Sequence, residues 1–505
     1  MKNSLTEEQQ EVVAAEGNIA VVANAGSGKT TAMVAKILHD VEDRVDHRGI
    51  VAITFTQKAA AEIKERLPRM NSVHFINTIN QFAIQEIINP FIADAKQLFH
   101  EKPLRPDYNC RFATRDQLDE LLVRKGVIAT YKDNSKNYIF ELASEVLFSS
   151  SACQRYIKAR YFKFFIDEYQ DCDQQMHNFF TVISHVIKIP IVAVGDTKQF
   201  IYGWRGACKN AFLDLSEKYG FKVLKLRKNF RSSAPVQNYI NLLYPSLFSD
   251  LFVRCELDNN VVFINASSHV WSDALLSILD TKKTTAVLCR KNDAARACAR
   301  VLEAKGMPCV FIQSPPINTV AGELFWLYFE LARYYLAANS SVFRFIDGIP
   351  NDKRDLISPS AIEHLLGPKT SYIESDFPNR VSSIISYFGG DFSMDDYNLL
   401  IQTIGGKQYH PVFEDHLPNC VALTIHSSKG REFEQVVLFA DDYDLRNPDD
   451  IDLHYVAASR ASHKIVVCVE NSNKVSFMIP LSHLYALANK SWRDVLSVYS
   501  PQTQD

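Results

Sequence analysis

Residues 18–31 read NIAVVANAGSGKTT and lead directly into AMVAKILHDV at residues 32–41. The run NIAVVA is short, apolar and β-branched, which predicts a buried strand, and the residues after the turn repeat apolar side chains at helical spacing. The turn itself, ANAGSGKT, matches a P-loop in which alanine replaces the first glycine. A strand, a phosphate-binding turn and a helix in this order indicate the first βα unit of an α/β nucleotide-binding domain.

This turn offers the groups that a nucleoside triphosphate requires. Gly26 and Gly28 let backbone N–H groups approach the phosphates, and Lys29 is expected to reach the β- and γ-phosphates. The hydroxyl of Thr30 is a suitable ligand for Mg²⁺. A chance glycine-rich turn would not explain the Lys-Thr pair together with the helix after it. We therefore predict binding of ATP or GTP with Mg²⁺ by the residues of this turn, Ala25, Gly26, Ser27, Gly28, Lys29, Thr30 and Thr31.

A second chemical signal stands at the end of another apolar run, KFFIDEYQD at residues 163–171. We expect Asp167 to hold the magnesium ion and Glu168 to activate the attacking water. By itself an Asp-Glu pair after a strand is equally consistent with a solvated strand end. The presence of Lys29 in the same chain favours the catalytic interpretation.

Further strand-like runs organise the chain into two α/β domains. In the first half they are GIVAITF (49–55), YFKFFID (161–167) and PIVAVGD (190–196), and in the second half VVFINA (261–266), TAVLCR (285–290), CVALTIH (420–426), QVVLFA (435–440) and KIVVCVE (464–470). Helical patterns fill the intervals, as parallel sheets require. We expect one domain from residues 1–83 and 149–245 with an insertion at 84–148, and a second from 246–315 and 416–505 with an insertion at 316–415. Both insertions are expected to be mainly helical.

Composition narrows the class of protein without identifying a partner. The formal net charge of −3 does not decide for or against nucleic acid. Ten cysteines without any Cys-x-x-Cys pair argue against a zinc site or a disulfide framework and fit a reducing cytoplasm. The N-terminus has no apolar segment of the signal-peptide kind, and the apolar stretch 324–338 contains Glu330 and Arg333, which predicts a buried helix. We expect a cytoplasmic protein that does not bind membranes.

Phosphoryl transfer also needs positive charge near the γ-phosphate, and two arginines stand in turn-like settings. They are Arg231 in LRKNFRSS and Arg460 in YVAASRAS. Each taken alone is as well explained as a surface or salt-bridge arginine. Their sequence context decides the interpretation.

The motifs occur in a characteristic order along the chain. Besides the P-loop they are LTEEQQ (5–10), TFTQKAAAEIKERL (54–67), NTINQF (77–82), IDEYQD (166–171), VGDTKQFIYGWRGA (194–207), LRKNFRSS (226–233), VLCRKNDAAR (287–296), LTIHSSKGREFEQVV (423–437) and LHYVAASRA (453–461). This series resembles the superfamily 1 helicases of the UvrD, Rep and PcrA type. The resemblance implies two RecA-like motor domains that hydrolyse ATP and move along single-stranded DNA, with 3′-to-5′ polarity expected.

Individual roles follow from the resemblance, position by position. Gln9 is similar to the glutamine that reads adenine, Phe230 to the aromatic residue that stacks on the base, and Glu432 to a residue near the ribose. Gln199 is similar to the sensor of the γ-phosphate. Arg231 and Arg460 are similar to the two arginine fingers.

The resemblance also implies a track for the nucleic acid strand. Its residues are Phe55, Thr78, Tyr202, Trp204 and His426. Aromatic side chains that stack on bases tolerate any sequence, although outside the IYGWRGA context Tyr202 and Trp204 would be interpreted as core aromatics. Three positions depart from the family pattern: Thr31 and Arg431 replace an arginine and a leucine, and Asn80 replaces a histidine. Base selectivity and strand contact are the properties that these departures affect.

A narrower resemblance points to the helicase subunits of Gabija anti-phage defence systems. It is carried by the short insertions and by EIINPFI (86–92), YFKFFIDEYQDCDQQMHNFF (161–180) and NTINQF (77–82). The resemblance implies a GajA-like partner, an OLD-family nuclease subunit with a TOPRIM domain, and action on DNA ends. Two alternatives stay open: a stand-alone repair helicase, and a regulatory ATPase that DNA stimulates without strand separation. RNA in place of DNA is also open.

Overall fold

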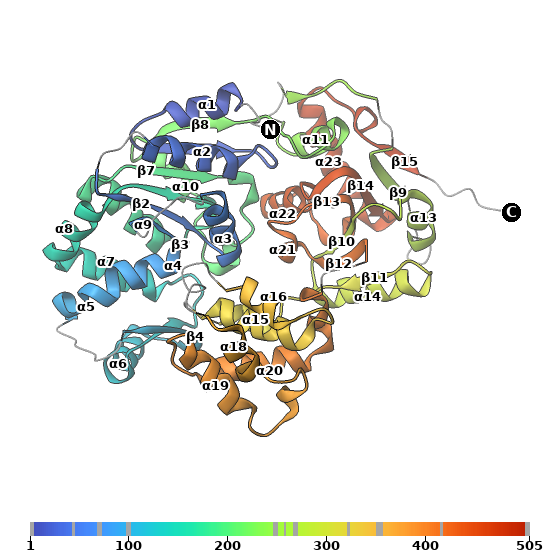
Figure 1. Ribbon diagram of the computed structural model, residues 1–505. Coiled ribbons are helices and arrows are strands. Elements are labelled where there is room, and N and C mark those ends of the chain that lie inside the picture. Colours follow the sequence, from blue (N-terminus) through green and yellow to red (C-terminus); the bar gives the residue numbers. More distant parts are fainter. Residues whose placement is uncertain are drawn as a thin grey trace. The chain divides into compact units, whose positions relative to one another are not determined.

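The computed structural model describes residues 5–42, 46–67, 73–96, 103–245, 251–256, 259–265, 271–320, 324–349, 357–414 and 418–499 (Figure 1). The chain divides into two compact units, Met1–Ser232 and Ser233–Asp505. This division lies before the expected domain boundary at residue 245. The reason is helix α11 (Ala234–Asn241), which packs on strands β9 (Val261–Asn265) and β14 (Ala461–Val469) of the second unit.

Within the described part of unit 1, six strands form one parallel sheet in the order β3-β2-β6-β7-β1-β8. Their bounds are β1 Ile19–Ala23, β2 Gly49–Thr54, β3 Phe75–Thr78, β6 Tyr161–Ile166, β7 Ile191–Gly195 and β8 Lys222–Leu226. The four runs predicted as strands in this half are confirmed as β1, β2, β6 and β7. The sequence did not predict β3 and β8, which form the two edges of the sheet, where burial is incomplete and the apolar pattern is weaker.

Helices cover both faces of this sheet (Figure 1). On one face α1 (Glu7–Ala14), α2 (Lys29–Glu42) and α3 (Gln57–Arg66) share an apolar core with the strands. A larger core on the other face includes a helix that is continuous from residue 79 to 96, together with several later helices. These elements are α4 (Ile79–Phe82), the π-helix η1 (Ala83–Ile88), α5 (Asn89–Lys96), α7 (Tyr138–Ser149), α8 (Ser151–Arg160), α9 (Gln174–Val182), the π-helix η3 (Ile183–Ile187) and α10 (Ala211–Glu217).

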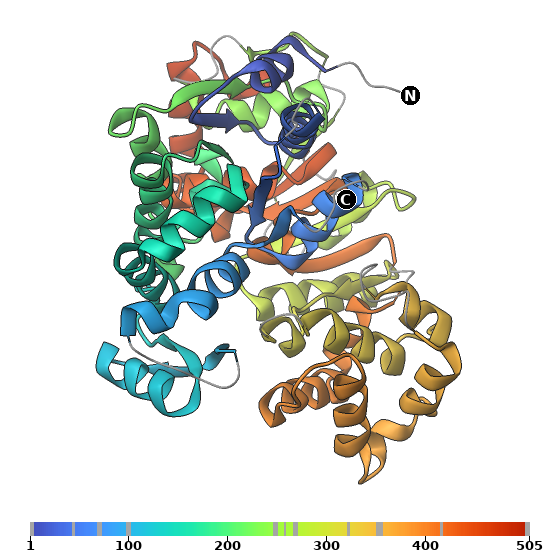
Figure 2. The same ribbon diagram turned by 60° about the vertical axis from the view of Figure 1, so that its left-hand side comes forward.

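The insertion at 84–148 contains a small parallel sheet that its composition did not indicate. Strands β4 (Arg105–Phe112) and β5 (Val127–Tyr131) pair across helix α6 (Arg115–Lys125) and lie in the cyan part of unit 1 in Figure 2. Arg115 forms ion pairs with Asp119 on its own helix and with Glu141 and Glu145 on α7. These ion pairs join α6 to α7 within the insertion, and α7 packs in the apolar core on one face of the six-stranded sheet.

Among the residues described for unit 2, seven strands form a second parallel sheet in the order β11-β12-β10-β13-β14-β9-β15. The five runs predicted as strands in this half are confirmed as β9, β10, β12, β13 and β14. The remaining bounds are β10 Thr285–Cys289, β11 Cys309–Phe311, β12 Cys420–Thr424, β13 Phe433–Phe439, β15 Ser497–Tyr499, α13 Trp271–Ile278, α14 Asn292–Ala304, α21 Ile425–Ser428, α22 Pro448–Ala458 and α23 Met478–Leu487. The fold class is therefore α/β, with two RecA-like parallel sheets flanked by helices.

All the regular elements among the described residues of the insertion at 316–415 are helices, and the insertion has an apolar core of its own. Its α-helices are α15 (Phe325–Leu336), α16 (Val342–Asp347), α18 (Pro359–Leu366), α19 (Phe377–Tyr387) and α20 (Met394–Gly405). The stretch 324–338, predicted as a buried helix, is confirmed as α15. In the described ranges of the chain, no helix combines the length and the apolar character needed to span a bilayer.

Glu330 on α15 gives a prediction about stability. Burial raises the pKa of this carboxyl to about 6, although Arg333 and Arg344 oppose the shift, and a Cβ on Gly348 would lie 2.2 Å from the Glu330 Cδ. A raised folded-state pKa contributes stability below the ordinary value near 4.5 and loses it as the pH rises through about 6. Glu330→Gln should therefore increase the free energy of unfolding at pH 7.5 by about 1–2 kcal/mol, because the amide stays neutral.

Urea denaturation at pH 4 and pH 7.5 measures this effect. The gain should be present at pH 7.5 and absent at pH 4. Glu363→Gln, on the exposed face of α18 in the same insertion, serves as the control and should change neither value. A destabilised Glu330→Gln protein at pH 7.5 would contradict the prediction.

Candidate nucleotide and strand-binding site

The phosphate-binding turn of unit 1 needs glycine at two positions. Strand β1 ends at Ala23 and α2 begins at Lys29, and between them Gly26 and Gly28 have φ values of 71° and 76°. A Cβ on Gly26 would lie 2.5 Å from the Asn229 Oδ1, and one on Gly28 would lie 2.8 Å from the Gln9 Nε2. Both the left-handed backbone and the close neighbours therefore exclude side chains here.

A segment far away in the sequence packs on this turn. The backbone N–H of Phe230 donates to the Gly26 carbonyl at 2.8 Å. The Asn229 Oδ1 accepts from the backbone N–H of Arg231 at 2.8 Å and of Ser232 at 3.0 Å, which folds residues 229–232 into a turn. The Phe230 side chain remains 54% exposed, with the Lys228 Nζ 5.3 Å from its ring centroid. Phe230 and Arg231 are thus both fixed beside the glycine-rich turn.

The two acidic residues follow strand β6 and meet the lysine of the turn. The Lys29 Nζ lies 3.1 Å from the Glu168 Oε1, and the Glu168 backbone N–H donates to the Asp167 Oδ1 at 2.9 Å. Glu168 has a left-handed backbone, with φ at 54° and ψ at 39°, which costs about 1–3 kcal/mol in a residue other than glycine. The tertiary structure holds this carboxylate in a strained position directly at Lys29.

Polar side chains at the end of the neighbouring strand β7 extend the site. The Gln199 Nε2 donates to the Asp196 Oδ2 at 2.9 Å, and the Lys198 Nζ contacts both Asp196 and the Asn24 Oδ1. Gln170 connects the two strand ends, because its Nε2 donates to Glu168 and its Oε1 accepts from the Asp196 backbone N–H. The sequence had not singled out Lys198, Asn24 or Gln170. Asn24 directly follows β1, and Gln170 and Lys198 stand in the motifs that follow β6 and β7, which was the available signal.

The oxygen donors at this edge suit magnesium. The hydroxyl of Thr30 follows Lys29, and the carboxylate of Asp167 precedes Glu168, so these oxygens belong to the two segments that the Lys29–Glu168 ion pair joins. Hydroxyl and carboxylate oxygens are hard ligands of the kind that Mg²⁺ takes in nucleotide sites. The Ser27 Oγ is also buried at this turn and has no hydrogen-bond partner within the described residues. The residues present therefore fit a magnesium nucleotide.

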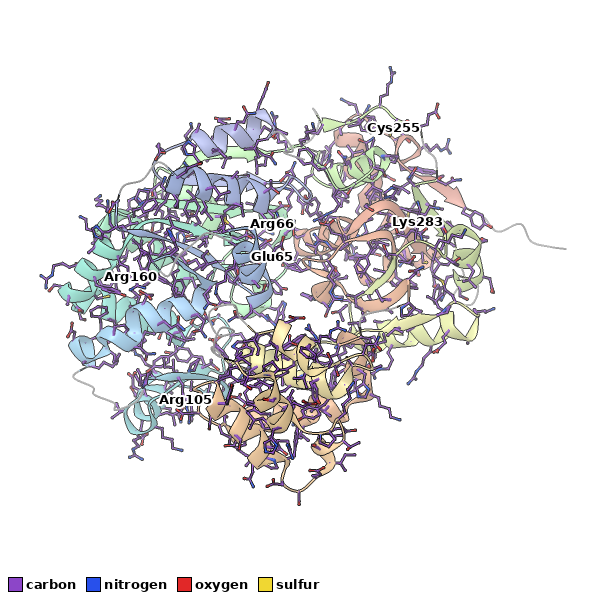
Figure 3. All side chains as sticks on the ribbon, viewed as in Figure 1. Glu65, Arg66, Arg105, Arg160, Cys255 and Lys283 are labelled. Carbon is purple, nitrogen blue, oxygen red and sulfur yellow. The ribbon has the colours of Figure 1, made fainter. Side chains whose placement is uncertain are left out.

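On the other side of the turn, Gln9 is held rigidly. It forms a capping box with Thr6 at the start of α1, and its Nε2 donates to the Ser27 carbonyl at 3.3 Å. Arg66, marked on α3 in Figure 3, donates from Nη1 to the Thr31 Oγ1 at 3.5 Å and pairs with Glu62. Thr31, where the resemblance leads one to expect an arginine, is therefore contacted by a guanidinium from another helix, which the sequence did not reveal.

The residues of unit 1 that are expected to contact the nucleic acid lie at the ends of β-strands and on one turn. Phe55 directly follows β2 and Thr78 ends β3, and these two strands pair with Thr54 opposite Thr78. Trp204 is 57% exposed, and the Arg205 guanidinium lies 4.6 Å from its ring centroid and 5.3 Å from that of Tyr202. Trp204 is thus a surface side chain and not a core aromatic.

The remaining predicted residues belong to unit 2. His426 lies on α21, directly after β12, and Glu432 is an exposed residue directly before β13. Arg460 is only 3% exposed, and its guanidinium donates to the Val456 carbonyl at 3.0 Å and the Ser459 Oγ at 2.8 Å. The Arg460 carbonyl accepts from the Phe433 N–H at 2.9 Å, which places the segments of Glu432 and Arg460 side by side.

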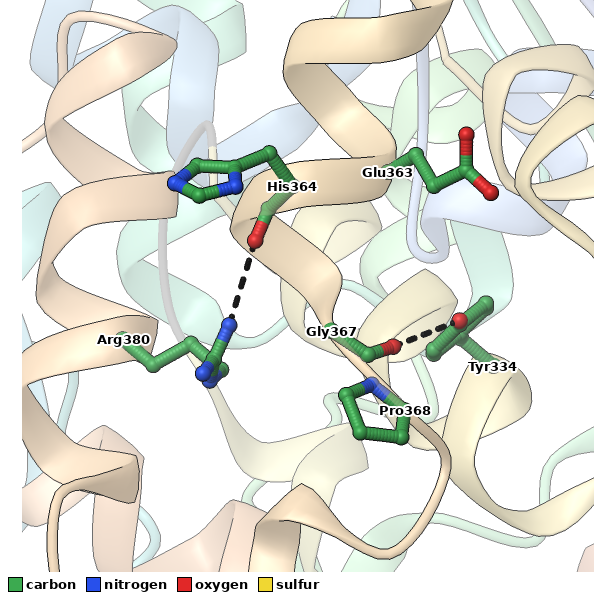
Figure 4. A pocket seen from close by; sticks show the side chains of 6 residues that line it. All are labelled: Tyr334, Glu363, His364, Gly367, Pro368 and Arg380. Atoms are coloured by element: carbon green, nitrogen blue, oxygen red, sulfur yellow. Dashed lines mark hydrogen bonds between the residues drawn. The ribbon is translucent and has the colours of Figure 1, made fainter.

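A hollow elsewhere in unit 2 has a structural explanation. Figure 4 shows it at the end of α18, lined by Tyr334, Glu363, His364, Gly367, Pro368 and Arg380. The Arg380 guanidinium donates to the His364 and Leu365 carbonyls, and the Tyr334 hydroxyl donates to the Gly367 carbonyl at 2.9 Å. These groups cap a helix end, and none of the predicted site residues lies there.

Comparison with known families agrees with this arrangement. A family model for the UvrD/REP helicase N-terminal domain matches residues 5–150 and 138–220, and one for the UvrD-like helicase C-terminal domain matches residues 419–468. In unit 1 the matched ranges contain the phosphate-binding turn, the acidic residues Asp167 and Glu168, and the turn that carries Tyr202 and Trp204. They also contain His426, Glu432 and Arg460 of unit 2.

Individual relatives agree with the family models. The Gabija protein GajB of Bacillus cereus (strain VD045) is 32% identical over 477 residues, which span 92% of this chain and 95% of that protein. A probable DNA helicase II homolog of Rickettsia conorii is 25% identical over 46% of this chain and 43% of its own length. The ATP-dependent DNA helicase PcrA of Staphylococcus epidermidis is 24% identical over 48% of this chain and 40% of its own length. The chain therefore belongs to the UvrD/Rep helicase family, as a member of its GajB group.

Proposed function

We propose that this chain is the ATP-driven motor of a Gabija-type anti-phage defence complex and moves 3′ to 5′ along single-stranded DNA in the cytoplasm. The observation that carries the motor assignment is the ion pair of Lys29 with Glu168, 3.1 Å long, on a turn that only glycines allow. Similarity over nearly the full length of GajB supports the defence role.

The site residues suit hydrolysis of the γ-phosphate. Glu168 orients the attacking water and accepts its proton, while Lys29 and Arg231 stabilise the charge on the transferred group. Thr30 and Asp167 would hold magnesium, which would neutralise charge on the phosphate oxygens. Gln199 senses the γ-phosphate, and Gln170 connects its strand end to Glu168 through hydrogen bonds. On the base side Gln9 reads the adenine edge and Phe230 stacks on its face.

Single-stranded DNA is bound by sequence-tolerant stacking. Trp204, Tyr202 and Phe55 offer aromatic surfaces in unit 1, Thr78 ends the neighbouring strand, and His426 contributes from unit 2. Arginine beside Trp204 adds a positive charge for the phosphate backbone. A motor that steps along any sequence needs this kind of surface because each base has a stacking face.

The strand-binding surface is tested by Trp204→Ala. Loss of one base–aromatic stack, worth about 1–3 kcal/mol, should weaken binding of an oligo(dT) by about 5- to 150-fold in a fluorescence anisotropy titration. Trp492→Ala is the matched control, because Trp492 also lies beside an arginine, with the Arg493 guanidinium 5.2 Å from its ring centroid, but outside the proposed track. Equal affinities of the wild type and Trp204→Ala would contradict the assignment.

The motor assignment itself is tested by steady-state ATP hydrolysis with no nucleic acid, single-stranded DNA, duplex DNA with free ends, and RNA. Strong stimulation by single-stranded DNA is expected. If RNA stimulates hydrolysis and DNA does not, the substrate is RNA and not DNA. Turnover that no nucleic acid changes would refute the motor assignment.

The implied partner is an OLD-family nuclease subunit with a TOPRIM domain. Co-expression with an OLD-family TOPRIM nuclease of the GajA type, followed by affinity purification and size-exclusion chromatography, should yield a stable complex. Failure of the two chains to co-purify would refute the Gabija role and leave the helicase family membership untouched.

A regulatory ATPase that does not separate strands is the second candidate. We base it on the short insertions, 84–148 and 316–415, and on the match to stand-alone helicases, which covers less than half of this chain and less than half of each of those proteins. An unwinding assay on a 3′-tailed duplex decides between the two. DNA-stimulated hydrolysis without product strands would select the regulatory ATPase.

A further inference from the structure

Two helix N-caps of unit 1 are joined by one hydrogen bond. The Asn137 Oδ1 caps α7 by accepting from the Phe140 N–H at 3.3 Å, and the Asp173 Oδ1 caps α9 by accepting from the Met176 N–H at 2.8 Å. Their remaining side-chain atoms face each other, with the Asn137 Nδ2 donating to the Asp173 Oδ2 at 2.7 Å. The inserted subdomain is thus linked to the acidic segment that begins at Asp167.

Asp173 also contacts the turn 202–207, which carries Tyr202 and Trp204. It forms an isolated antiparallel bridge with Ala207, and the Cys208 N–H donates to the Cys172 carbonyl at 2.8 Å. Ala207 closes the turn 202–207, because its N–H donates to the Tyr202 carbonyl at 3.3 Å. The turn and Asp173 are therefore joined by backbone contacts.

The loop that carries Asn137 packs against the same turn. Gly206 has φ at 88°, and a Cβ there would lie 2.5 Å from the Asn134 carbonyl oxygen and 2.7 Å from the Ser135 Cα. These neighbours are backbone atoms that no side-chain rotation can move away. The loop 133–137, the turn 202–207 and the segment 167–173 are in direct contact at one joint.

Asp173 depends on its partner at this joint. The residue is 8% exposed, and burial raises the pKa of its carboxyl, whereas the hydrogen bond from Asn137 stabilises the charged form. A buried carboxylate that loses a donor either moves or takes up a proton. Both responses change the start of α9, two residues beyond the turn at Tyr169–Asp171 that follows Glu168.

We infer that Asn137 is a positioning residue that couples the binding of single-stranded DNA at the turn 202–207 to ATP hydrolysis at Glu168, the residue that activates water. The inference rests on the proposed function, since it assigns the element through which single-stranded DNA stimulates hydrolysis. A base stacked on Trp204 fixes the turn 202–207, the Ala207–Asp173 bridge passes this constraint to the acidic segment, and Asn137 holds that segment against the inserted subdomain. Contiguous hydrogen-bonded contacts of this kind are a physical route for coupling two sites.

Two substitutions separate the joint from the helix cap. Asn137→Ser keeps a favourable N-cap but is too short to reach Asp173, and Asn137→Asp keeps the cap while it sets one carboxylate against another. ATP hydrolysis is measured with and without saturating oligo(dT). Basal turnover and the KM for ATP should not change, and the stimulated kcat should fall by about 2- to 30-fold, the range that substitutions in coupling networks produce. The Asp variant should lose more than the Ser variant.

Asn89→Ala is the matched control. The Asn89 side chain holds the inserted subdomain through both the N–H and the carbonyl of Leu104, at 2.8 and 3.2 Å, but it lies outside the joint. This variant should keep full stimulation even where its Tm falls. If the Asn137 variants do not fold, as judged by their Tm, Gly206→Ala pushes the turn 202–207 away from the loop 133–137 of the same joint and should reduce stimulation in the same way.

The outcomes distinguish this inference from the proposed function. Wild-type protein that single-stranded DNA does not stimulate would overturn both. Wild-type stimulation that persists in Asn137→Ser and Asn137→Asp would overturn the inference alone. A parallel loss of basal and stimulated turnover would also overturn it, because that pattern indicates a purely structural role.

Discussion

Lys29→Ala should lower the kcat of ATP hydrolysis by about 10³-fold or more, with or without DNA. The Lys29 ammonium lies at the end of a turn that two glycines hold open for phosphate oxygens, and it lies 3.1 Å from the Glu168 carboxylate. Its removal takes a positive charge away from the β- and γ-phosphates. It also removes the ammonium group that contacts the Glu168 carboxylate.

The variant is measured by steady-state phosphate release and by equilibrium titration with a fluorescent ATP analogue. Lys64→Ala, on the exposed face of α3, is the control for loss of a lysine charge and should keep wild-type turnover. Affinity for the analogue should fall in Lys29→Ala alone. Turnover that Lys29→Ala leaves unchanged would refute the P-loop assignment.

Glu168→Gln should reduce turnover by about 10²- to 10⁴-fold while nucleotide affinity stays close to that of the wild type. Glutamine has the size of glutamate and lacks the basic carboxylate that accepts the proton of the attacking water. It keeps an oxygen that Lys29 and Gln170 can contact, so the geometry of the strand end should persist. The chemical step is lost and binding is retained.

The same two assays check this result, with Glu65→Gln on the exposed surface of α3 as the control for loss of a carboxylate. Loss of nucleotide affinity in Glu168→Gln would assign this residue to binding and contradict its catalytic role. Normal turnover would move the role of the water-activating base to another residue. Lys29→Ala should lose both nucleotide affinity and turnover, whereas Glu168→Gln should lose turnover alone. This contrast tests whether Lys29 acts in binding and Glu168 in the chemical step.

The predicted strands show how much of the fold local sequence contains. Runs that are buried on both faces carry an unbroken apolar signal, and all nine that the sequence identified are strands of the two sheets. The edge strands β3, β8, β11 and β15 escaped prediction. An edge strand is short and partly exposed, so its stability comes from pairing with a neighbour and not from its own pattern.

The insertion at 84–148 illustrates the same limit. Strand β4 contains charged and polar residues such as Arg105 and Asp107, which gave no strand signal. Strand β5 is the short apolar run VIATY, which was not predicted as a strand. The two strands are held by pairing with each other and by the ion pairs of Arg115 with α7. Contacts between residues far apart in the sequence decide such elements, and a local pattern does not contain them.

The sequence by itself determined the parallel α/β architecture, the phosphate-binding turn and the order of the helicase motifs, because each depends on residue types at fixed short spacing. Only the tertiary structure decided which of these residues meet. Glu168 reaches Lys29 across 139 positions of the chain, Phe230 is fixed on Gly26, and Asn137 is hydrogen-bonded to Asp173. For the first two, the physical reason is that parallel strands bring their carboxyl ends to one edge of a sheet. Asn137 and Asp173 meet because the helices that they cap, α7 and α9, pack in one core. No local pattern records which side chains meet in either case.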